Sequence, residues 1–166
     1  MFEEFQGIPM HPLLVHAAVV LLPLQVAAAI AYGVLPRFRR YLGWFVAGVA
    51  VAAPLSTYIA RLSGQALRDR LIRNGTSDAG VLASIQQHND FADLAMYSSI
   101  ALGVLMLALL VLEVRRTRAA ADGPGPGGLN VLMIIVIVLA LGAAGTTGYY
   151  VFRTGDSGAK MTWTGR

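Results

Sequence analysis

The chain has 166 residues, of which 56% are hydrophobic and only 13% are charged, with a net charge of +4 and a mean hydropathy of +0.62. Soluble domains carry roughly 25% charged residues, so this composition indicates an integral membrane protein. The basic residues cluster where apolar stretches end, which argues against a nucleic-acid partner. The absence of cysteine excludes disulfides, thiolate metal sites, iron–sulfur clusters and haem attached through Cys-x-x-Cys-His.

Four apolar stretches are long enough to cross a bilayer, which needs about 20 residues of helix. We predict spans at residues 12–35, 41–60, 92–112 and 129–152. The first span is expected to be retained, because the start of the chain carries Glu3 and Glu4 instead of the basic region of a secretory signal. Little sequence remains outside the spans, so we predict one domain over 1–166, an all-α, up-down membrane four-helix bundle.

The connections between the spans carry helix-boundary signals. Arg61 to Arg73 has an amphipathic pattern and stops at Asn74-Gly75, a typical C-cap, so an external interfacial helix is predicted between spans two and three. After the N-cap cluster Thr76-Ser77-Asp78, a second helix is predicted to run through His88 into span three without a break. The Gly- and Pro-rich segment Gly123–Gly128 is predicted to be a non-helical turn joining spans three and four as an antiparallel hairpin.

Arginines determine the expected orientation. The short segments after spans one and three contain Arg37, Arg39 and Arg40 and the basic run 115–118, and dense Arg in short loops favours the cytoplasmic side. Both chain ends would then lie outside. The excess of arginine over the single Lys160, together with the high Gly and Ala content, favours a bacterial origin and hence an inner-membrane location.

Span four carries small residues at three-residue spacing, at Gly142, Gly145 and Gly148. Close backbone approach drives helix association in lipid, so this face is predicted to contact another helix. Room for the edge of a flat ligand is the second interpretation of the same face. Pro23 and Pro54 are interpreted as architectural kinks within spans one and two.

The chain has three histidines, and all three are expected near the outer end of the bundle. His16 lies in a stretch without charged residues, where an ionisable side chain is costly and therefore indicates a functional site. Pro12 at a first helical position would place His11 at the helix cap and His16 one turn inside. The two are about 140° apart around a helix and cannot both bind one ion, so we predict that His16 faces His88.

A facing pair of neutral imidazoles, with no thiolate or carboxylate, is typical of b-type haem held axially in a bundle core. The predicted cofactor and metal ligands are His16 and His88, with His11 as a further cofactor-binding candidate. Ser84, Gln25 or freed backbone carbonyls would accept hydrogen bonds from the ring nitrogens that do not bind iron.

Two other interpretations of the histidines stay open. Histidine near a membrane interface is often an ordinary polar residue that reaches water at little cost. Alternatively, Asp90, Asp93 and Asp156 are expected on the same side of the membrane, where they and a histidine would offer the N and O ligands of a Zn²⁺ or Cu²⁺ site.

The string from Gly7 to His16, which contains His-Pro-Leu-Leu-Val-His, resembles the domain-of-unknown-function 2231 family of bacterial membrane proteins, as do the histidine before span three and the tail 154–163. The resemblance implies four helices and a distant similarity to bis-histidine b-type cytochromes, with His16 and His88 as ligands. Many relatives carry histidine where this chain has Asp156, and Phe-Pro where it has Ala17-Ala18. The departure at Asp156 implies that this position is not a required haem ligand here.

Two function classes follow from these patterns. In the first, the chain binds haem b and carries electrons, alone, as a homo-oligomer or as a small subunit of a larger membrane redox complex. In the second, it is a cofactor-free accessory subunit, favoured by the lack of a nucleophile–base constellation. A redox carrier is expected rather than a stand-alone enzyme, since no Gly-x-Ser-x-Gly or His-Glu-x-x-His string is present.

A transporter is the third interpretation, because the spans contain scattered polar side chains. These are Gln25, Ser56, Thr57, Ser98, Ser99, Thr146 and Thr147. Hydrogen bonding between helices explains them more simply than a transport path.

Overall fold

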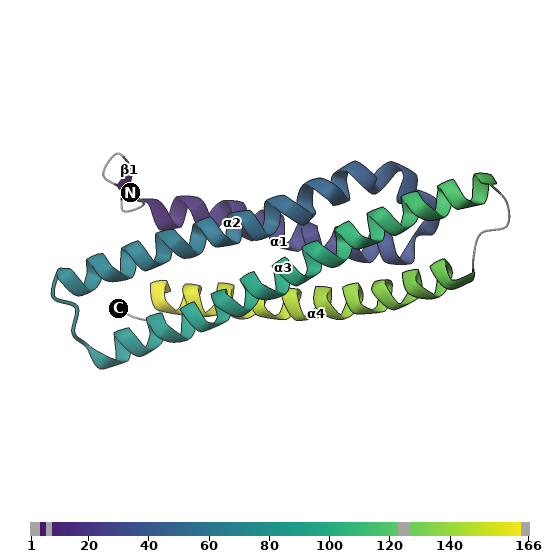
Figure 1. Ribbon diagram of the computed structural model, residues 1–166. Coiled ribbons are helices and arrows are strands. Elements are labelled where there is room, and N and C mark those ends of the chain that lie inside the picture. Colours follow the sequence, from purple (N-terminus) through teal and green to yellow (C-terminus); the bar gives the residue numbers. More distant parts are fainter. Residues whose placement is uncertain (1–3, 6–7, 123–126, 164–166) are drawn as a thin grey trace.

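The computed structural model describes residues 4–5, 8–122 and 127–163. Figure 1 shows the long helices gathered into one elongated bundle. They are α1 (Met10–Val34), α2 (Arg39–Arg73), α3 (Ala79–Asp122) and α4 (Gly127–Trp163). The short 3-10 turn η1 (Pro36–Phe38) joins α1 to α2, and an antiparallel pair of two-residue strands, β1 (Glu4–Phe5) and β2 (Ile8–Pro9), precedes α1.

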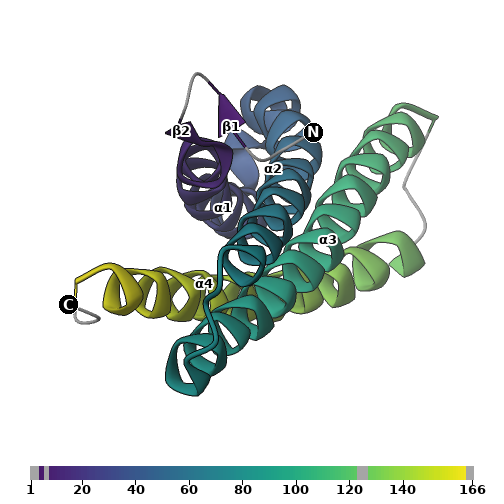
Figure 2. The ribbon, with the colours of Figure 1, turned by 90° about the vertical axis from the view of Figure 1, so that its left-hand side faces the viewer.

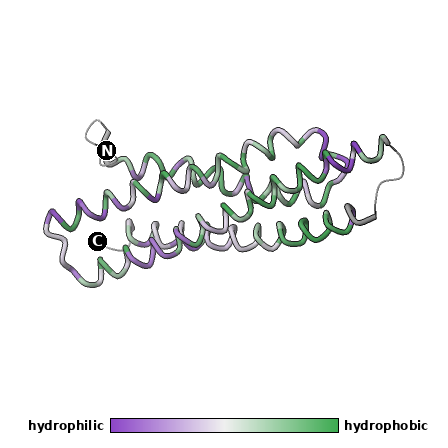
Figure 3. The backbone as a smooth tube through the Cα atoms, viewed as in Figure 1, coloured by the Kyte–Doolittle hydropathy of each residue, from purple (hydrophilic) through white to green (hydrophobic). Residues whose placement is uncertain are grey.

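All four helices are long and apolar enough to cross a membrane, which confirms the predicted four-span class. Large apolar side chains such as Val19, Val104 and Ile134 are exposed on the outside of the bundle, where lipid would cover them. Figure 3 shows apolar residues along the middle of the helices and hydrophilic residues toward both ends.

Residues 61–73 do not form the separate interfacial helix that the amphipathic pattern predicted. They continue α2 without a break to Arg73, because no proline follows Pro54 in this helix. The helix ends at the predicted signal, where Gly75 adopts a φ of +94° and its amide donates to the Ile72 carbonyl at 3.0 Å. The end of α2 and the start of α3 therefore extend past the N-terminus of α1 and the C-terminus of α4 (Figure 1).

The predicted long third helix is confirmed, since α3 runs from Ala79 through His88 to Asp122. Its first turn is capped by Asp78, whose carboxylate accepts a hydrogen bond from the Val81 amide at 2.9 Å. Gly127 and Gly128 are helical and belong to α4, contrary to the predicted turn, while residues 123–126 of that turn lie outside the described residues.

The helices occupy the corners of a square. α1 packs against α2 and α4, and α3 packs against the same two helices, so α1 and α3 are diagonal partners. The turned view in Figure 2 shows the α1–α2 pair stacked on the α3–α4 pair. Near the middle of the bundle the diagonal is bridged by Gln25, which donates to the Ser99 carbonyl at 3.0 Å and accepts from the Ser99 hydroxyl at 2.7 Å.

Hydrogen bonding between helices is therefore confirmed for Gln25 and Ser99. The other intramembrane hydroxyls donate to carbonyls three or four residues earlier in their own helix, as Thr57 does to Ala53, so the same prediction is wrong for them. A hydroxyl in an apolar helix is satisfied locally without a partner helix.

The predicted packing face of α4 is also wrong. A Cβ atom added to Gly142, Gly145 or Gly148 would meet nothing within 4 Å, so these glycines do not contact a neighbouring helix. The close approach lies instead at Gly103 of α3, where an added Cβ would stand 2.4 Å from the Ala50 carbonyl oxygen of α2. Gly103 allows α2 and α3 to meet beside the bridge at the bundle centre.

Candidate functional site

His16 lies on the outside of the bundle. Its side chain is exposed, and its Nδ1 is hydrogen-bonded to the Pro12 carbonyl one turn earlier in the same helix. The ring makes no recorded hydrogen bond to α2, α3 or α4 within the described residues. The predicted facing pair of His16 and His88 is therefore not brought together.

His11 is the histidine of α1 that points into the bundle. Its Nδ1 lies 3.1 Å from the Ala60 carbonyl and 3.0 Å from the Ser63 hydroxyl, both on α2. The ring packs beside Gly64, where an added Cβ would stand 3.1 Å from its Cε1. α1 begins at Met10, so His11 occupies the first helical turn, and the 140° between positions 11 and 16 directs His16 away from the bundle.

His88 of α3 has the same kind of environment on α4. Its Nδ1 lies 2.9 Å from the Ser157 hydroxyl, which is in turn hydrogen-bonded to the Thr154 carbonyl. An added Cβ at Gly158 would stand 3.2 Å from the His88 Cε1. Each ring is therefore held by a serine and packs against the glycine that follows it, and the His11 ring also contacts the Ala60 carbonyl.

The hydrogen bonds determine which nitrogen of each ring carries the proton. The Ser63 hydroxyl donates to the Ala60 carbonyl at 2.7 Å, and the Ser157 hydroxyl donates to Thr154 at 3.0 Å, so each serine oxygen is left to accept. A carbonyl can only accept as well. His11 therefore donates from Nδ1–H to the Ala60 carbonyl, and the hydrogen bond from Ser157 to Thr154 favours the same tautomer for His88, which would leave the Nε2 lone pairs available to a ligand.

No partner for either Nε2 is recorded in the part of the chain that the structure describes. No fully buried side-chain nitrogen in that part lacks a partner either, so neither Nε2 atom is completely enclosed by the protein. His11 and His88 lie on the diagonal helices α1 and α3, at the same end of the bundle. They are the two histidines whose rings contact a neighbouring helix there.

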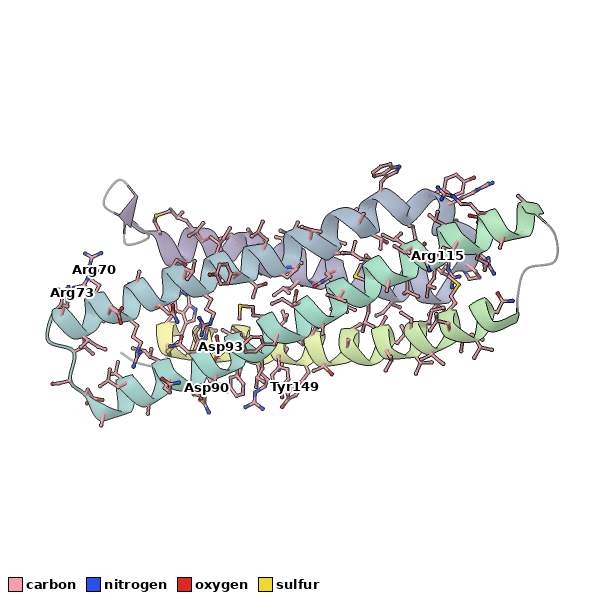
Figure 4. All side chains as sticks on the ribbon, viewed as in Figure 1. Arg70, Arg73, Asp90, Asp93, Arg115 and Tyr149 are labelled. Atoms are coloured by element: carbon pink, nitrogen blue, oxygen red, sulfur yellow. The ribbon has the colours of Figure 1, made fainter. Side chains whose placement is uncertain are left out.

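The carboxylates at this end have other partners. Asp93 forms a bidentate ion pair with Arg61, in which Nε donates to Oδ1 and Nη2 donates to Oδ2 at 3.0 Å, and Figure 4 shows Asp93 on the side of α3 toward α2. Asp156 pairs with Lys160 on α4 at 2.8 Å, and Asp90 accepts from Gln86 at 2.8 Å. Among the described residues, no three His, Asp or Glu side chains gather to hold a metal ion.

The hydrogen-bond partners predicted for the histidine rings are also different. Gln25 is engaged with Ser99, and Ser84 donates to the Gly80 carbonyl at 2.9 Å in its own helix. Ser63 and Ser157 were not identified from the sequence. The Ser-Gly pairs 63–64 and 157–158 are the signal that would have found them, because each pair lies near the end of a helix antiparallel to a histidine-bearing one.

Exposed aromatic side chains indicate the depth of this site. Tyr41 and Trp44 mark one end of the bundle, and Tyr58, Tyr97 and Tyr149 mark the other. Tyr and Trp favour membrane interfaces, and 17 residues of helix between Tyr41 and Tyr58 span about 25 Å, close to the thickness of a hydrocarbon core. His11 and His88 contact Ser63 of α2 and Ser157 of α4, which lie farther toward this end of the bundle than Tyr58 and Tyr149.

Four apolar helices with a histidine pair at one end define a multi-pass membrane protein. A family model described as a predicted membrane protein, DUF2231, matches residues 7–166, and the chain belongs to this family. Comparison with curated proteins and with solved structures gave no match.

Proposed function

We propose that the protein binds one b-type haem through the Nε2 atoms of His11 and His88 and carries electrons at the outer face of a bacterial inner membrane, with both chain ends outside. One observation carries the proposal: two imidazoles on diagonal helices each donate from Nδ1 and leave Nε2 unengaged. A fixed Nδ1–H donor is the usual support of a metal-bound histidine. His11 replaces His16 as the ligand of α1.

The residues at this end fit the needs of haem better than those of a bare metal ion. A protein zinc site takes three or four side-chain ligands, and no such group is found in the described chain. Haem brings four nitrogen ligands of its own, so a histidine pair would complete its coordination. Below the histidines, Ala18, Ala53 and Ala60 belong to one buried apolar cluster.

The bound haem would supply one-electron chemistry. His11 and His88 would hold it through Nε2, with their Nδ1–H groups bonded to the protein, at the end of the bundle beyond Tyr58, Tyr97 and Tyr149. That position suits electron exchange with a partner outside the membrane, whether the protein acts alone, as a homo-oligomer or as a small subunit of a redox complex.

The test is a visible spectrum of the protein purified in mild detergent from haem-replete cells, recorded oxidised and reduced. We expect a Soret band and low-spin bands in the wild type and in His16→Ala, because His16 contributes no ligand. The bands should be lost or changed to high spin in His11→Ala and in His88→Ala. A colourless wild type that also fails to bind added haemin would overturn the proposal and favour the cofactor-free accessory subunit. Bands that depend on His16 and not on His11 would contradict the ligand assignment.

A further inference from the structure

The two histidine environments are copies of each other. In each, a histidine in the early part of one helix donates from Nδ1 to a serine near the end of the following helix, and that serine donates to the carbonyl three residues before it. A glycine follows each serine and lies against the imidazole Cε1. The first copy is built from α1 and α2, and the second from α3 and α4.

The correspondence fixes an alignment of the two hairpins. His88 follows His11 by 77 positions, and Ser157 follows Ser63 by 94 positions. Both offsets are defined by residues at the histidine end of the bundle. When they are applied to the rest of the helices, buried residues of the first hairpin align with buried residues of the second. In α1 and α3 they match Ala18 with Ala95, Leu22 with Ser99, and Tyr32 with Leu109, all of them buried.

The same holds for the second helix of each hairpin. The offset of 94 matches Val46 with Ala140, Ala50 with Ala144, and Ala53 with Thr147, again all buried. Inward-facing positions recur with the same helical period in any bundle, so this match follows once the histidines and serines are placed in register. Together with the shared histidine contacts, it gives the two hairpins the arrangement of parallel repeats, which in membrane proteins are related by an axis along the membrane normal.

We propose that each repeat contributes one ligand histidine together with its own positioning serine, Ser63 for His11 and Ser157 for His88. This inference rests on the proposed function, since it assigns the serines to the same ligand site. The ligand would lie on the axis between the repeats and receive one equivalent imidazole from each. A ligand with two similar faces, as a haem presents to its axial histidines, suits such a site.

The physical role of the serine follows from the shared acceptors. The Ala60 carbonyl alone would let the His11 ring pivot about a single hydrogen bond. The Ser63 oxygen gives Nδ1–H a second acceptor at 3.0 Å, and its own proton is held by the Ala60 carbonyl, so the ring is fixed in orientation. Loss of such an outer-shell partner typically weakens metal binding about 10- to 100-fold.

The experiment uses the full-length protein labelled with ¹⁵N-histidine, which gives signals from only three imidazoles. In the haem-free form, Ser63→Ala should shift the nitrogen resonances of His11 and leave those of His88 in place, and Ser157→Ala should do the reverse. Haemin titration should show about 10- to 100-fold weaker binding in each variant. Ser63→Thr and Ser157→Thr, which keep the hydroxyl, should restore both readouts.

Ser56→Ala is the matched control. Ser56 is buried in α2 and donates to the carbonyl three residues earlier at 2.7 Å, as Ser63 does, but has no histidine partner. It should leave all three imidazoles and haemin affinity unchanged. Unshifted rings in both serine variants would overturn the positioning role, and a response at only one site would overturn the equivalence of the repeats. A wild type that binds no haemin would reject the proposed function, while the resonances still decide the role of the serines.

Discussion

Gly103→Ala is expected to destabilise the bundle by about 1–3 kcal/mol, the range found for overpacked cores. The added Cβ would stand 2.4 Å from the Ala50 carbonyl oxygen, and a backbone atom cannot move aside as a flexible side chain can. α2 and α3 would have to separate, which would disturb the neighbouring hydrogen bonds between Gln25 and Ser99. Unfolding in detergent, followed by circular dichroism, measures the change.

Gly145→Ala is the control for this substitution. Its added Cβ would meet nothing within 4 Å, so only the higher helix propensity of alanine remains, which favours the folded state slightly. Gly103→Ala should therefore unfold well before the wild type, and Gly145→Ala at or just after it. Equal stability of the two variants would contradict the close packing of α2 against α3.

Glu113→Gln is expected to cost about 3 kcal/mol, because it leaves the buried Arg39 without its charged partner. Arg39 is 7% exposed and lies 3.2 Å from the Glu113 carboxylate. Its Nε and Nη2 donate to the Tyr32 and Gly33 carbonyls at the end of α1. The two carbonyl acceptors remain in the variant, and Glu113 is 18% exposed. We therefore expect a loss of stability at the lower end of the range for broken buried ion pairs.

Asp156→Asn provides the comparison for the charge effect. Asp156 and Lys160 form an exposed pair on α4, and pairs of this kind contribute about 0–1 kcal/mol. Unfolding in detergent should therefore show a clearly larger loss of stability for Glu113→Gln than for Asp156→Asn. A Glu113→Gln protein as stable as Asp156→Asn would show that Arg39 is not held by a buried charge at that end of the bundle.

The helices could be predicted from the sequence because their signals are local. Apolar length gives the spans, Asp78 caps α3 through its own side chain, and Gly75 ends α2 through its own φ. The prediction of a separate interfacial helix was wrong because an amphipathic pattern shows which side of a helix is apolar. It does not show where one helix ends and another begins. The chain after Pro54 offers none before Arg73, so α2 continues.

The candidate site was only partly predictable. Three histidines at one end of the bundle follow from topology, and the 140° between positions 11 and 16 agrees with their directions, since His11 contacts α2 and His16 is exposed. Which of the two faces inward depends on the rotation of α1 about its axis, and that is determined by its contacts with α2 at Ala60 and Ser63. Such contacts join residues about 50 positions apart and leave no local signal.

The roles of glycine and arginine show the same limit. Gly142, Gly145 and Gly148 have the spacing of a packing face, yet the close contact is made by the single Gly103. Arg39 was interpreted as one of the loop charges that determine orientation, but it is buried and joins the end of α1 to Glu113 of α3. Spacing and charge counts do not say which neighbour a side chain reaches.

The proposed haem site requires that the side chain of His11, and not that of His16, lies near His88 at the end of the bundle. The chain has no cysteine, so His11→Cys/His88→Cys and His16→Cys/His88→Cys each introduce a unique thiol pair. After treatment of membranes with a short bis-maleimide, mass spectrometry of the protein counts intramolecular cross-links. We predict efficient cross-linking of the 11–88 pair and little of the 16–88 pair. Cross-linking of 16–88 without 11–88 would contradict the histidine pair and the haem site built on it.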